Sequence, residues 1–244
     1  MVELVGDRAS TERILVRLSI GGFDVDRTVR LARQYRRLGV RVLKFKVGVG
    51  TIDDAHRLAA VRAEVGDGPV FTIDANGVYS SADDAVRAYE KMAESQISLF
   101  EQPTPRRRIS MLAEVRRRID IPVMADESVF GPDELEEALA LEACDLVSLY
   151  PGKNGGFTRC LAMARRAEMA GIKCAIGSAL ETDLGQGAMA ALAASHRAFD
   201  VAGVGHDVQA AVMYEKSSVR EPICLEDGHV NVPKGAGFAV EPVW

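Results

Sequence analysis

The sequence predicts an α/β fold, a (β/α)8 barrel of the TIM type or its (β/α)7β variant. Short apolar, β-rich runs alternate with amphipathic helical stretches along nearly the whole chain, in steps of roughly 25 to 30 residues. Such alternation is typical of parallel strands joined by crossover helices. No Gly-rich dinucleotide fingerprint is present, which favours a closed barrel over an open doubly wound sheet. The chain length of 244 residues matches one barrel of about 250 residues.

The expected strands are apolar runs of strand length, and the last of them is weak. They cover 14–20, 42–47, 70–74, 97–101, 122–126, 145–149, 172–176 and 199–204. The expected helices share an apolar period of 3.6 residues. They cover 24–38, 53–65, 81–94, 109–119, 132–141, 156–170 and 184–196. Ser81 is a plausible N-cap, Pro132 suits a first helical position, and glycines follow several helix ends, for example Gly171.

Three segments follow from this pattern. Residues 14–223 are expected to form the barrel, and residues 1–13 precede it. Residues 224–244 form a closing segment, strand-like and punctuated by Gly and Pro, outside the eight units.

Composition excludes several classes of function. The net charge of −5 makes nucleic acid and anionic membranes poor partners. No apolar run reaches the roughly 18 residues of a membrane span, and the first residues lack the apolar core of a signal peptide. The four cysteines form no CxxC pair and are interpreted as scattered, reduced core thiols. We therefore expect a cytoplasmic protein.

Charged residues stand at the ends of successive expected strands. Asp74, Glu101 and Asp126 each end one strand, about one β/α unit apart, and Lys44 and Lys46 lie on the strand before them. Chemistry in such barrels sits at the carboxyl ends of the strands, where these three carboxylates would converge. Three like charges need raised pKa values or a counter-ion. A hard divalent cation such as Mg²⁺, which prefers oxygen ligands, resolves the conflict.

The two lysines are two residues apart on a strand, so both point to the same face. The opposite face carries only apolar residues. Two buried ammonium groups depress each other's pKa, so one of them is expected to be neutral near pH 7 and to act as a base.

These pieces together resemble the enolase superfamily, and within it the muconate lactonizing enzyme (muconate cycloisomerase) subgroup. The matching segments occur in the family's order and cover nearly the whole chain. They are Lys44-Phe45-Lys46, Ile73-Asp74-Ala75-Asn76, Phe100-Glu101-Gln102-Pro103, Ala125-Asp126-Glu127-Ser128 and the tail Asp227-Gly228-His229-Val230 with Pro233 and Gly235–Gly237. The resemblance implies the C-terminal barrel domain of that superfamily.

The resemblance also implies roles. Asp74, Glu101 and Asp126 would bind Mg²⁺, with Mn²⁺ as an alternative. Lys46 would abstract a proton α to the carboxylate of a small carboxylic-acid substrate, and Lys44 would tune Lys46 and contact the developing enolate. Asn76 and Glu127 would orient the metal ligands.

The chain departs from the subgroup at the strand that ends near residue 149. The subgroup carries a second lysine there; aligned on the Gly155–Gly156 pair, this position is Tyr150, and Lys153 matches a later residue. We expect Tyr150 at the site, as a phenolic donor or a pocket wall, with a loop that returns Lys153 as the rival. With one base, cycloisomerisation or syn-elimination is favoured over racemisation.

Two further departures concern the next loop and the chain length. The mandelate racemase subgroup relies on a histidine after the seventh strand; this chain has Glu181 in that loop, which resembles the muconate subgroup's glutamate or is simply a helix-start carboxylate. His206 is interpreted as a surface or capping residue. Family members carry a capping domain before the barrel, and we expect it to be absent here. By the same resemblance, residues 1–13 would be a remnant of the linker between cap and barrel.

Three functions therefore stay open at this point. The first is a Mg²⁺-dependent cycloisomerase or lyase. The second is a racemase or epimerase of amino-acid derivatives or dipeptides that uses Lys153. The third is a metal-binding barrel that is inactive until a separate capping domain supplies the lid. The resemblance also implies a homo-oligomer.

Overall fold

The structure is a computed structural model, and it describes residues 11–235, 237 and 239–243. Residues 1–10, which include most of the expected linker, lie outside the described part, as does the middle residue of the Gly235–Gly237 segment. The chain divides into two compact units, which are taken separately below. Unit 2 is Leu18–Ser148, and unit 1 takes the residues before Leu18 together with those from Leu149 onward.

Parallel strands in sequence order form the sheet of unit 2. They are β2 (Arg17–Ile20), β3 (Val42–Lys46), β4 (Val70–Asp74), β5 (Ile97–Glu101), β6 (Val123–Ala125) and β7 (Leu146–Leu149), of which only Arg17 and Leu149 fall outside the unit. The register sets Lys46 beside Asp74 and Asp74 beside Glu101. The ends of β3, β4 and β5 are therefore neighbours.

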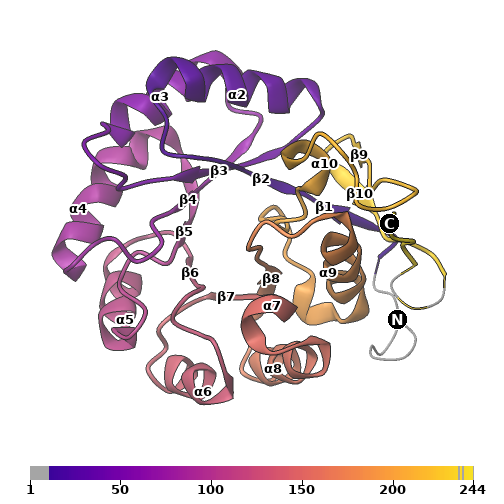
Figure 1. Ribbon diagram of the computed structural model, residues 1–244. Coiled ribbons are helices and arrows are strands. Elements are labelled where there is room, and N and C mark those ends of the chain that lie inside the picture. Colours follow the sequence, from indigo (N-terminus) through magenta and orange to yellow (C-terminus); the bar gives the residue numbers. More distant parts are fainter. Residues whose placement is uncertain (1–10, 236, 238, 244) are drawn as a thin grey trace. The chain divides into compact units, whose positions relative to one another are not determined.

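Helices follow the strands of unit 2 and lie on the outer side of its sheet (Figure 1). They are α2 (Val25–Arg37), α3 (Asp54–Val65), α4 (Ala82–Met92), the short η1 (Ala93–Ser95), α5 (Ile109–Arg118) and α6 (Pro132–Ala140). The expected Ser81 cap is present, since its side chain accepts a hydrogen bond from Asp84 N at 3.1 Å. The predicted and observed bounds of α2 to α6 differ by at most two residues, the usual uncertainty at frayed ends.

Unit 1 contains the remaining helices and strands. They are β1 (Arg13–Leu15), α7 (Pro151–Asn154), α8 (Phe157–Met169), β8 (Lys173–Ile176), α9 (Asp183–Ser195), η2 (Arg197–Phe199), α10 (Ala210–Met213), β9 (Leu225–Glu226) and β10 (His229–Asn231). Helix α9 is rich in Ala and Gly and is buried over most of its length. The short helices α7 and α10 carry no amphipathic period, and sequence reasoning missed both.

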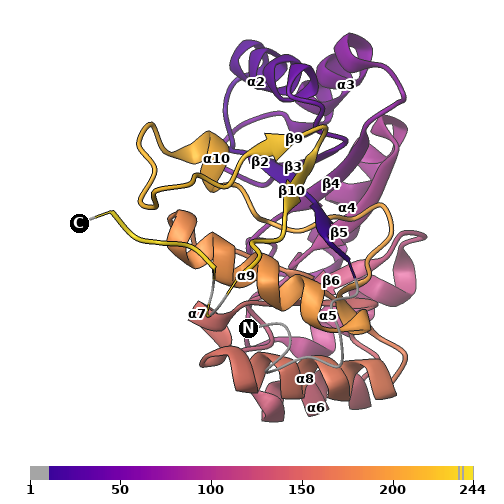
Figure 2. The same cartoon turned by 90° about the vertical axis from the view of Figure 1, so that its right-hand side faces the viewer.

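The strand-like closing segment forms a hairpin in unit 1. β9 and β10 are joined by Asp227 and Gly228, whose φ values of +46° and +73° suit a two-residue type I′ turn (Figure 2). β10 pairs in turn with β1, with Ile14 opposite Val230. The first expected strand, 14–20, is therefore interrupted at Val16, because its first part is held in this small antiparallel sheet.

The prediction of an eighth strand at residues 199–204 is wrong. Those residues form the end of η2 and turns, and the strand-like contacts fall later, at His206 and Asp207. His206 N donates to Leu15 O at 2.9 Å, Arg17 N donates to His206 O at 2.8 Å, and Asp207 N donates to Ile176 O at 2.9 Å. Isolated backbone hydrogen bonds, rather than a continuous ladder, hold this segment. The sequence therefore shows no run of alternating apolar residues from which a strand could be predicted here.

Two smaller findings concern the cysteines and membranes. Cys144, Cys160 and Cys174 are buried free thiols as expected, but Cys224 is exposed and is not a core residue. Within the described ranges, no helix combines the length and the apolar character that a membrane span requires.

Candidate functional site

Two lysines leave the same face of β3 in unit 2, as the spacing predicts. Lys44 is buried, with 5% of its side chain exposed, and Lys46 is 30% exposed. The opposite face, Leu43, Phe45 and Val47, is fully buried and apolar. Packing of that face fixes the strand, so the two amines are directed away from the hydrophobic core.

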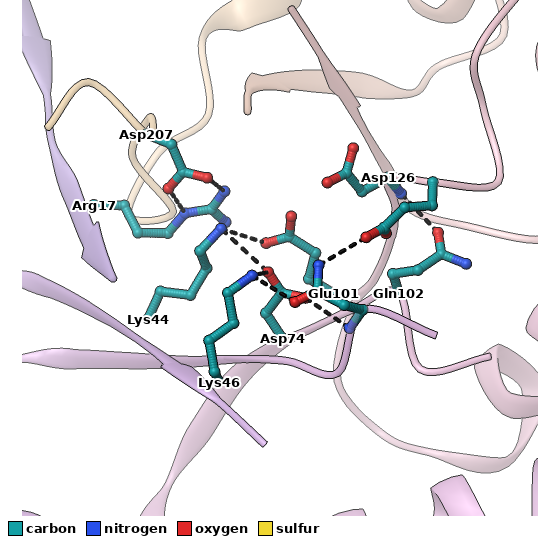
Figure 3. A network of polar contacts seen from close by, with 10 residues as sticks. Arg17, Lys44, Lys46, Asp74, Glu101, Gln102, Asp126 and Asp207 are labelled. Atoms are coloured by element: carbon teal, nitrogen blue, oxygen red, sulfur yellow. Dashed lines mark hydrogen bonds and ion pairs between the residues drawn. The ribbon is translucent and has the colours of Figure 1, made fainter. Parts of the chain in front are cut away.

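Lys44 connects the carboxylates of the next two strands. Its Nζ lies 3.2 Å from Glu101 Oε2 and 3.3 Å from Asp74 Oδ2 (Figure 3). Both carboxylates are 1% exposed, so each depends on a nearby cation for compensation. Lys44 is therefore a buried positive centre between two buried acids.

Lys46 also contacts Asp74 but remains accessible to solvent. Its Nζ lies 2.7 Å from Asp74 Oδ2 and donates to Asn76 Oδ1 at 2.6 Å. Burial alone would raise the pKa of Asp74, but the charges of Lys44 and Lys46 hold that pKa below its ordinary value. Asp74 is thus ionised, and Lys46 is the amine that a solute can reach. We call Lys44, Lys46, Asp74 and Glu101 the lysine cluster.

Asn76 links the lysine cluster to the loop after β6. Its Nδ2 donates to Glu127 Oε1 at 2.7 Å, and its backbone N donates to Asp74 Oδ1 at 3.0 Å. Burial and the charge of Asp126 raise the pKa of Glu127. The other oxygen, Glu127 Oε2, is buried with no hydrogen-bond partner among the described residues. Asn76 has a φ of +45°, in the left-handed region, which residues other than glycine adopt at some cost in free energy.

Asp126 follows β6 and is positioned through Gln102. Gln102 Oε1 accepts from Asp126 N at 2.9 Å and from Ser128 N at 3.0 Å, while its Nε2 donates to Ser128 Oγ and Thr104 O, each at 2.7 Å. Sequence reasoning quoted Gln102 only as part of a motif and assigned it no role. A polar residue directly after a strand-end acid was the available signal.

Of the three carboxylates that were expected to converge, only two lie close together. Asp74 and Glu101 meet at Lys44, but no group of three acids, histidines or cysteines within the described residues is close enough together to hold a metal ion. In Figure 3 the Asp126 side chain lies apart from the lysines. Like charges repel, and the lysines compensate the two acids that do meet.

The residues nevertheless suit a hard cation. Every side-chain donor that the sequence assigns to the metal is a carboxylate oxygen, the ligand type that Mg²⁺ prefers. The buried, unbonded Glu127 Oε2 adds one more acceptor beside Asp126.

Tyr150 and Lys153, the rival residues, lie together in unit 1. Tyr150 precedes α7 and Lys153 lies within it; the Lys153 Nζ lies 5.1 Å from the centre of the Tyr150 ring. Both side chains are half-buried. Asn154 Oδ1 accepts from Tyr150 N at 2.9 Å and holds the start of this turn.

Glu181 lies in the loop after β8 of the same unit. Its Oε2 accepts from Ser178 Oγ at 2.6 Å, and both of its oxygens accept from Ala179 N. A Cβ on Gly152 would lie 3.5 Å from Glu181 Oε1, so the carboxylate is near the turn that carries Tyr150 and Lys153. The structure therefore brings these three residues together.

The interpretation of His206 as a surface residue is wrong. His206 is 5% exposed, and its Nδ1 accepts from Ile176 N at 3.0 Å. Burial and the nearby charge of Arg17 lower its pKa to about 4. Arg17 holds Asp207 through two bonds, of 3.0 and 3.1 Å. We call Arg17, His206 and Asp207 the arginine–histidine cluster.

Comparison with known proteins gives consistent matches. The muconate cycloisomerase 1 of Rhodococcus opacus is 29% identical over 204 residues, which cover 82% of this chain and 54% of that protein. The hydrophobic dipeptide epimerase of Enterococcus faecalis is 35% identical over 191 residues, which cover 78% of this chain and 52% of that protein. The chain thus spans about half the length of these curated relatives.

A solved structure agrees over nearly the whole chain. The dipeptide epimerase from Enterococcus faecalis, complexed with Mg and the dipeptide L-Leu-L-Tyr, has a TM-score of 0.88 and 30% identity, covering 98% of this chain and 66% of that one. The predicted α/β fold class is therefore confirmed. The family described as "Enolase C-terminal domain-like" matches residues 27–244. The chain belongs to the enolase C-terminal domain-like family.

Proposed function

We propose that the protein abstracts a proton α to the carboxylate of a small carboxylic acid and stabilises the resulting enolate, leading to cycloisomerisation or syn-elimination. The observation that carries this proposal is the lysine cluster. One amine is buried between two acids, and a second amine, two residues along the same strand, is exposed to solvent.

Lys46 is the proposed base. It is 30% exposed, and Asp74 and Asn76 hold its amine from two sides. A base must be within hydrogen-bond reach of the proton that it removes, and an amine held in one place meets that need better than a mobile one. Because Lys46 is the proposed single base, it also returns the proton where the reaction requires one.

Lys44 is the proposed electrostatic partner. Its ammonium is buried and keeps a fixed position between Asp74 and Glu101. A preorganised positive charge in a dry environment stabilises negative charge that develops on the substrate during proton removal.

Asp74, Glu101 and Asp126 are the proposed ligands of Mg²⁺ or Mn²⁺, with Asn76 and Glu127 as their orienting partners. When bound, the cation supplies a Lewis acid that stabilises the charge of the substrate carboxylate and of its enolate. Tyr150 serves as a phenolic donor or a pocket wall. Glu181 holds its own loop, the one after β8, through Ser178.

A racemase or epimerase is the second candidate. Such an enzyme needs a second base. The Lys153 amine lies 5.1 Å from the centre of the Tyr150 ring, and Tyr150 occupies the position of the subgroup's second lysine, so Lys153 is near the place where that base is expected. The dipeptide epimerase of Enterococcus faecalis among the relatives points the same way. A homo-oligomer, or a separate capping domain as partner, stays a prediction.

Isotope exchange tests these functions. The protein is incubated in D₂O with muconolactone, which is the lactone that muconate cycloisomerisation forms and which carries α-protons, and with L-Leu-L-Tyr and an N-succinyl amino acid, with and without Mg²⁺. Mg²⁺-dependent exchange that Lys46→Ala abolishes supports the proposal; exchange that survives Lys46→Ala refutes the base assignment. Inversion at the α-carbon that Lys153→Met abolishes and Tyr150→Phe spares selects the epimerase. Exchange only after a capping polypeptide is added selects the third function, a barrel inactive alone.

A further inference from the structure

Arg57 is a fully buried arginine at the carboxyl end of β3, next to the proposed base. It lies in the first turns of α3 and is 0% exposed. Its guanidinium donates to Lys46 O at 2.5 Å and to Gly21 O at 2.9 Å. It therefore connects the backbone of the β3 end with the residue that follows β2.

Asp54 completes the arrangement. Its Oδ1 accepts from Arg57 at 2.6 Å, and its Oδ2 accepts from Gly48 N at 2.7 Å. Gly48 has a φ of +72°, and a Cβ there would overlap with the Val78 side chain, so the chain turns sharply at a position that only glycine fits. The Arg57–Asp54 pair thus holds the carbonyl of Lys46 and the turn two residues later.

The Lys46 carbonyl has no strand to pair with on that side. Val47 N donates to Asp74 O on β4. Lys46 O belongs to the same trans peptide group, in which the C=O and the N–H point in opposite directions, so Lys46 O points away from β4. β2 has already ended at Ile20. The guanidinium supplies the donor that a longer β2 would have supplied.

Stability alone is a weak reason for this pair. Burying a charged pair costs several kcal/mol of desolvation per ion, on the order of what the pair regains, and apolar replacements are often as stable. Arg57 Nε is moreover buried without a hydrogen-bond partner in the described part of the chain, an additional cost. A costly buried group at the carboxyl end of a strand is better explained by the site that it supports.

We propose that Arg57, through its pair with Asp54, is a positioning residue that fixes the backbone of Lys46 and thereby the place of the Lys46 amine against Asp74 and Asn76. This inference rests on the proposed function of Lys46 as the base. Arg57 itself contacts no reacting atom.

The chain offers a matched control. Arg116 on α5 pairs with Asp145 at 2.9 Å, and Asp145 Oδ2 accepts from Val123 N at 2.8 Å. This is the same arrangement, an arginine on a helix whose acid partner holds a strand backbone, but it lies at the amino ends of β6 and β7. Arg57→Lys and Arg57→Met are therefore compared with Arg116→Lys and Arg116→Met in the full chain.

Three measurements are made on each variant. The first is kcat and KM for Mg²⁺-dependent α-proton exchange with L-Leu-L-Tyr, the N-succinyl amino acid and muconolactone. The second is amide hydrogen exchange at Gly48 by NMR. The third is the rate at which a small acetylating reagent modifies Lys46, relative to the exposed Lys91, by mass spectrometry at fixed pH. Thermal unfolding establishes that each variant is folded.

We expect Arg57→Lys, which keeps the charge but loses the planar fork, to lower kcat by about 10- to 100-fold with little change in KM. Gly48 amide exchange should become at least about tenfold faster, and the Lys46 acetylation rate should change. The Arg116 variants should lower thermal stability and leave all three readouts at the wild-type level. If Arg57→Met does not fold, Asp54→Asn takes its place.

Unchanged kcat, Gly48 exchange and Lys46 acetylation in a folded Arg57 variant would overturn the positioning role. An equal loss of kcat in the Arg116 variants would overturn it too, because general destabilisation would then be the cause. If the wild-type chain exchanges none of the three probes, the proposed function fails for them. The amide and acetylation measurements then decide the positioning role by themselves.

Discussion

The lysine cluster of unit 2 and the arginine–histidine cluster of unit 1 both contain buried charged residues, yet they are bonded differently. In the arginine–histidine cluster, the backbone of His206 bonds to the backbone of Leu15 and Arg17, and its ring accepts from Ile176 N. All three cluster members are at most 5% exposed. In the lysine cluster, Lys46 bonds to side chains and is 30% exposed.

The difference separates structural from chemical roles. A buried side chain that bonds to a buried backbone group, as His206 does, contributes to stability, because its loss leaves that backbone group unpaired. A side chain that bonds to other side chains near solvent can exchange a partner for a substrate or an ion. We therefore expect changes in the lysine cluster to affect activity first and changes in the arginine–histidine cluster to affect stability first.

The largest expected effect comes from Lys46→Ala. Removing the proposed base should lower α-proton exchange by about 10²- to 10⁴-fold, the usual contribution of general base catalysis. Because Lys46 is partly exposed, the free energy of unfolding should change little. The measurement is ¹H NMR exchange in D₂O beside urea denaturation. A large loss of stability would place Lys46 with the structural cluster and remove the contrast.

Asp74→Asn should affect both activity and stability. Asp74 lies within 3.3 Å of both lysine amines, so its loss leaves two ammonium groups poorly compensated and should destabilise the protein by about 3 kcal/mol. A chelator should stop exchange in the wild type, and added Mg²⁺ should restore it there but not in Asp74→Asn. Urea denaturation and the exchange assay measure the two effects. Full recovery of Asp74→Asn with Mg²⁺ would contradict the ligand assignment.

His206→Gln should alter stability at acid pH. The pKa of folded His206 is about 4, below its ordinary value of 6.5, so the unfolded chain binds a proton that the folded chain does not. Stability is therefore present above pH 6.5 and is lost as the pH falls from 6.5 toward 4, by about 3 kcal/mol. Glutamine keeps an acceptor for Ile176 N but does not titrate.

The measurement is the free energy of unfolding in urea at pH 7 and pH 4.5. The wild type should lose more stability between these values than His206→Gln, by about 2–3 kcal/mol. Equal losses in the two proteins would show that His206 does not titrate across this range on unfolding.

The smallest expected effect comes from Arg116→Ala, which calibrates the comparison. Arg116 and Asp145 are 30% and 31% exposed, so solvent screens the pair, and its removal should cost about 1 kcal/mol. Exchange activity should stay at the wild-type level. A loss of activity would mean that pairs at the amino ends of the strands also influence the lysine cluster.

The sequence predicted the shared face of the two lysines and the neighbouring positions of Asp74 and Glu101, because both follow from local patterns, but it also predicted that Asp126 would converge with them. A strand repeats every two residues, so Lys44 and Lys46 share a face, and parallel strands in sequence order put Asp74 beside Glu101. These local patterns did not predict the roles of Gln102 and Arg57, because both side chains bond to backbone groups of other segments. They also misplaced His206, because the residue pairs through single backbone groups rather than through a run of apolar residues.

The sequence by itself determined the alternation of strands and helices, the shared face of Lys44 and Lys46 and the resemblance to the enolase superfamily, because periodicity and strand-end residues are properties of short segments. Only the tertiary structure decided which lysine is buried and which is reachable, that Asp74 and Glu101 meet while Asp126 is held by Gln102, and that Tyr150, Lys153 and Glu181 gather in one turn region. Burial and hydrogen-bond partners arise from contacts between distant segments, and these contacts set which charges are compensated.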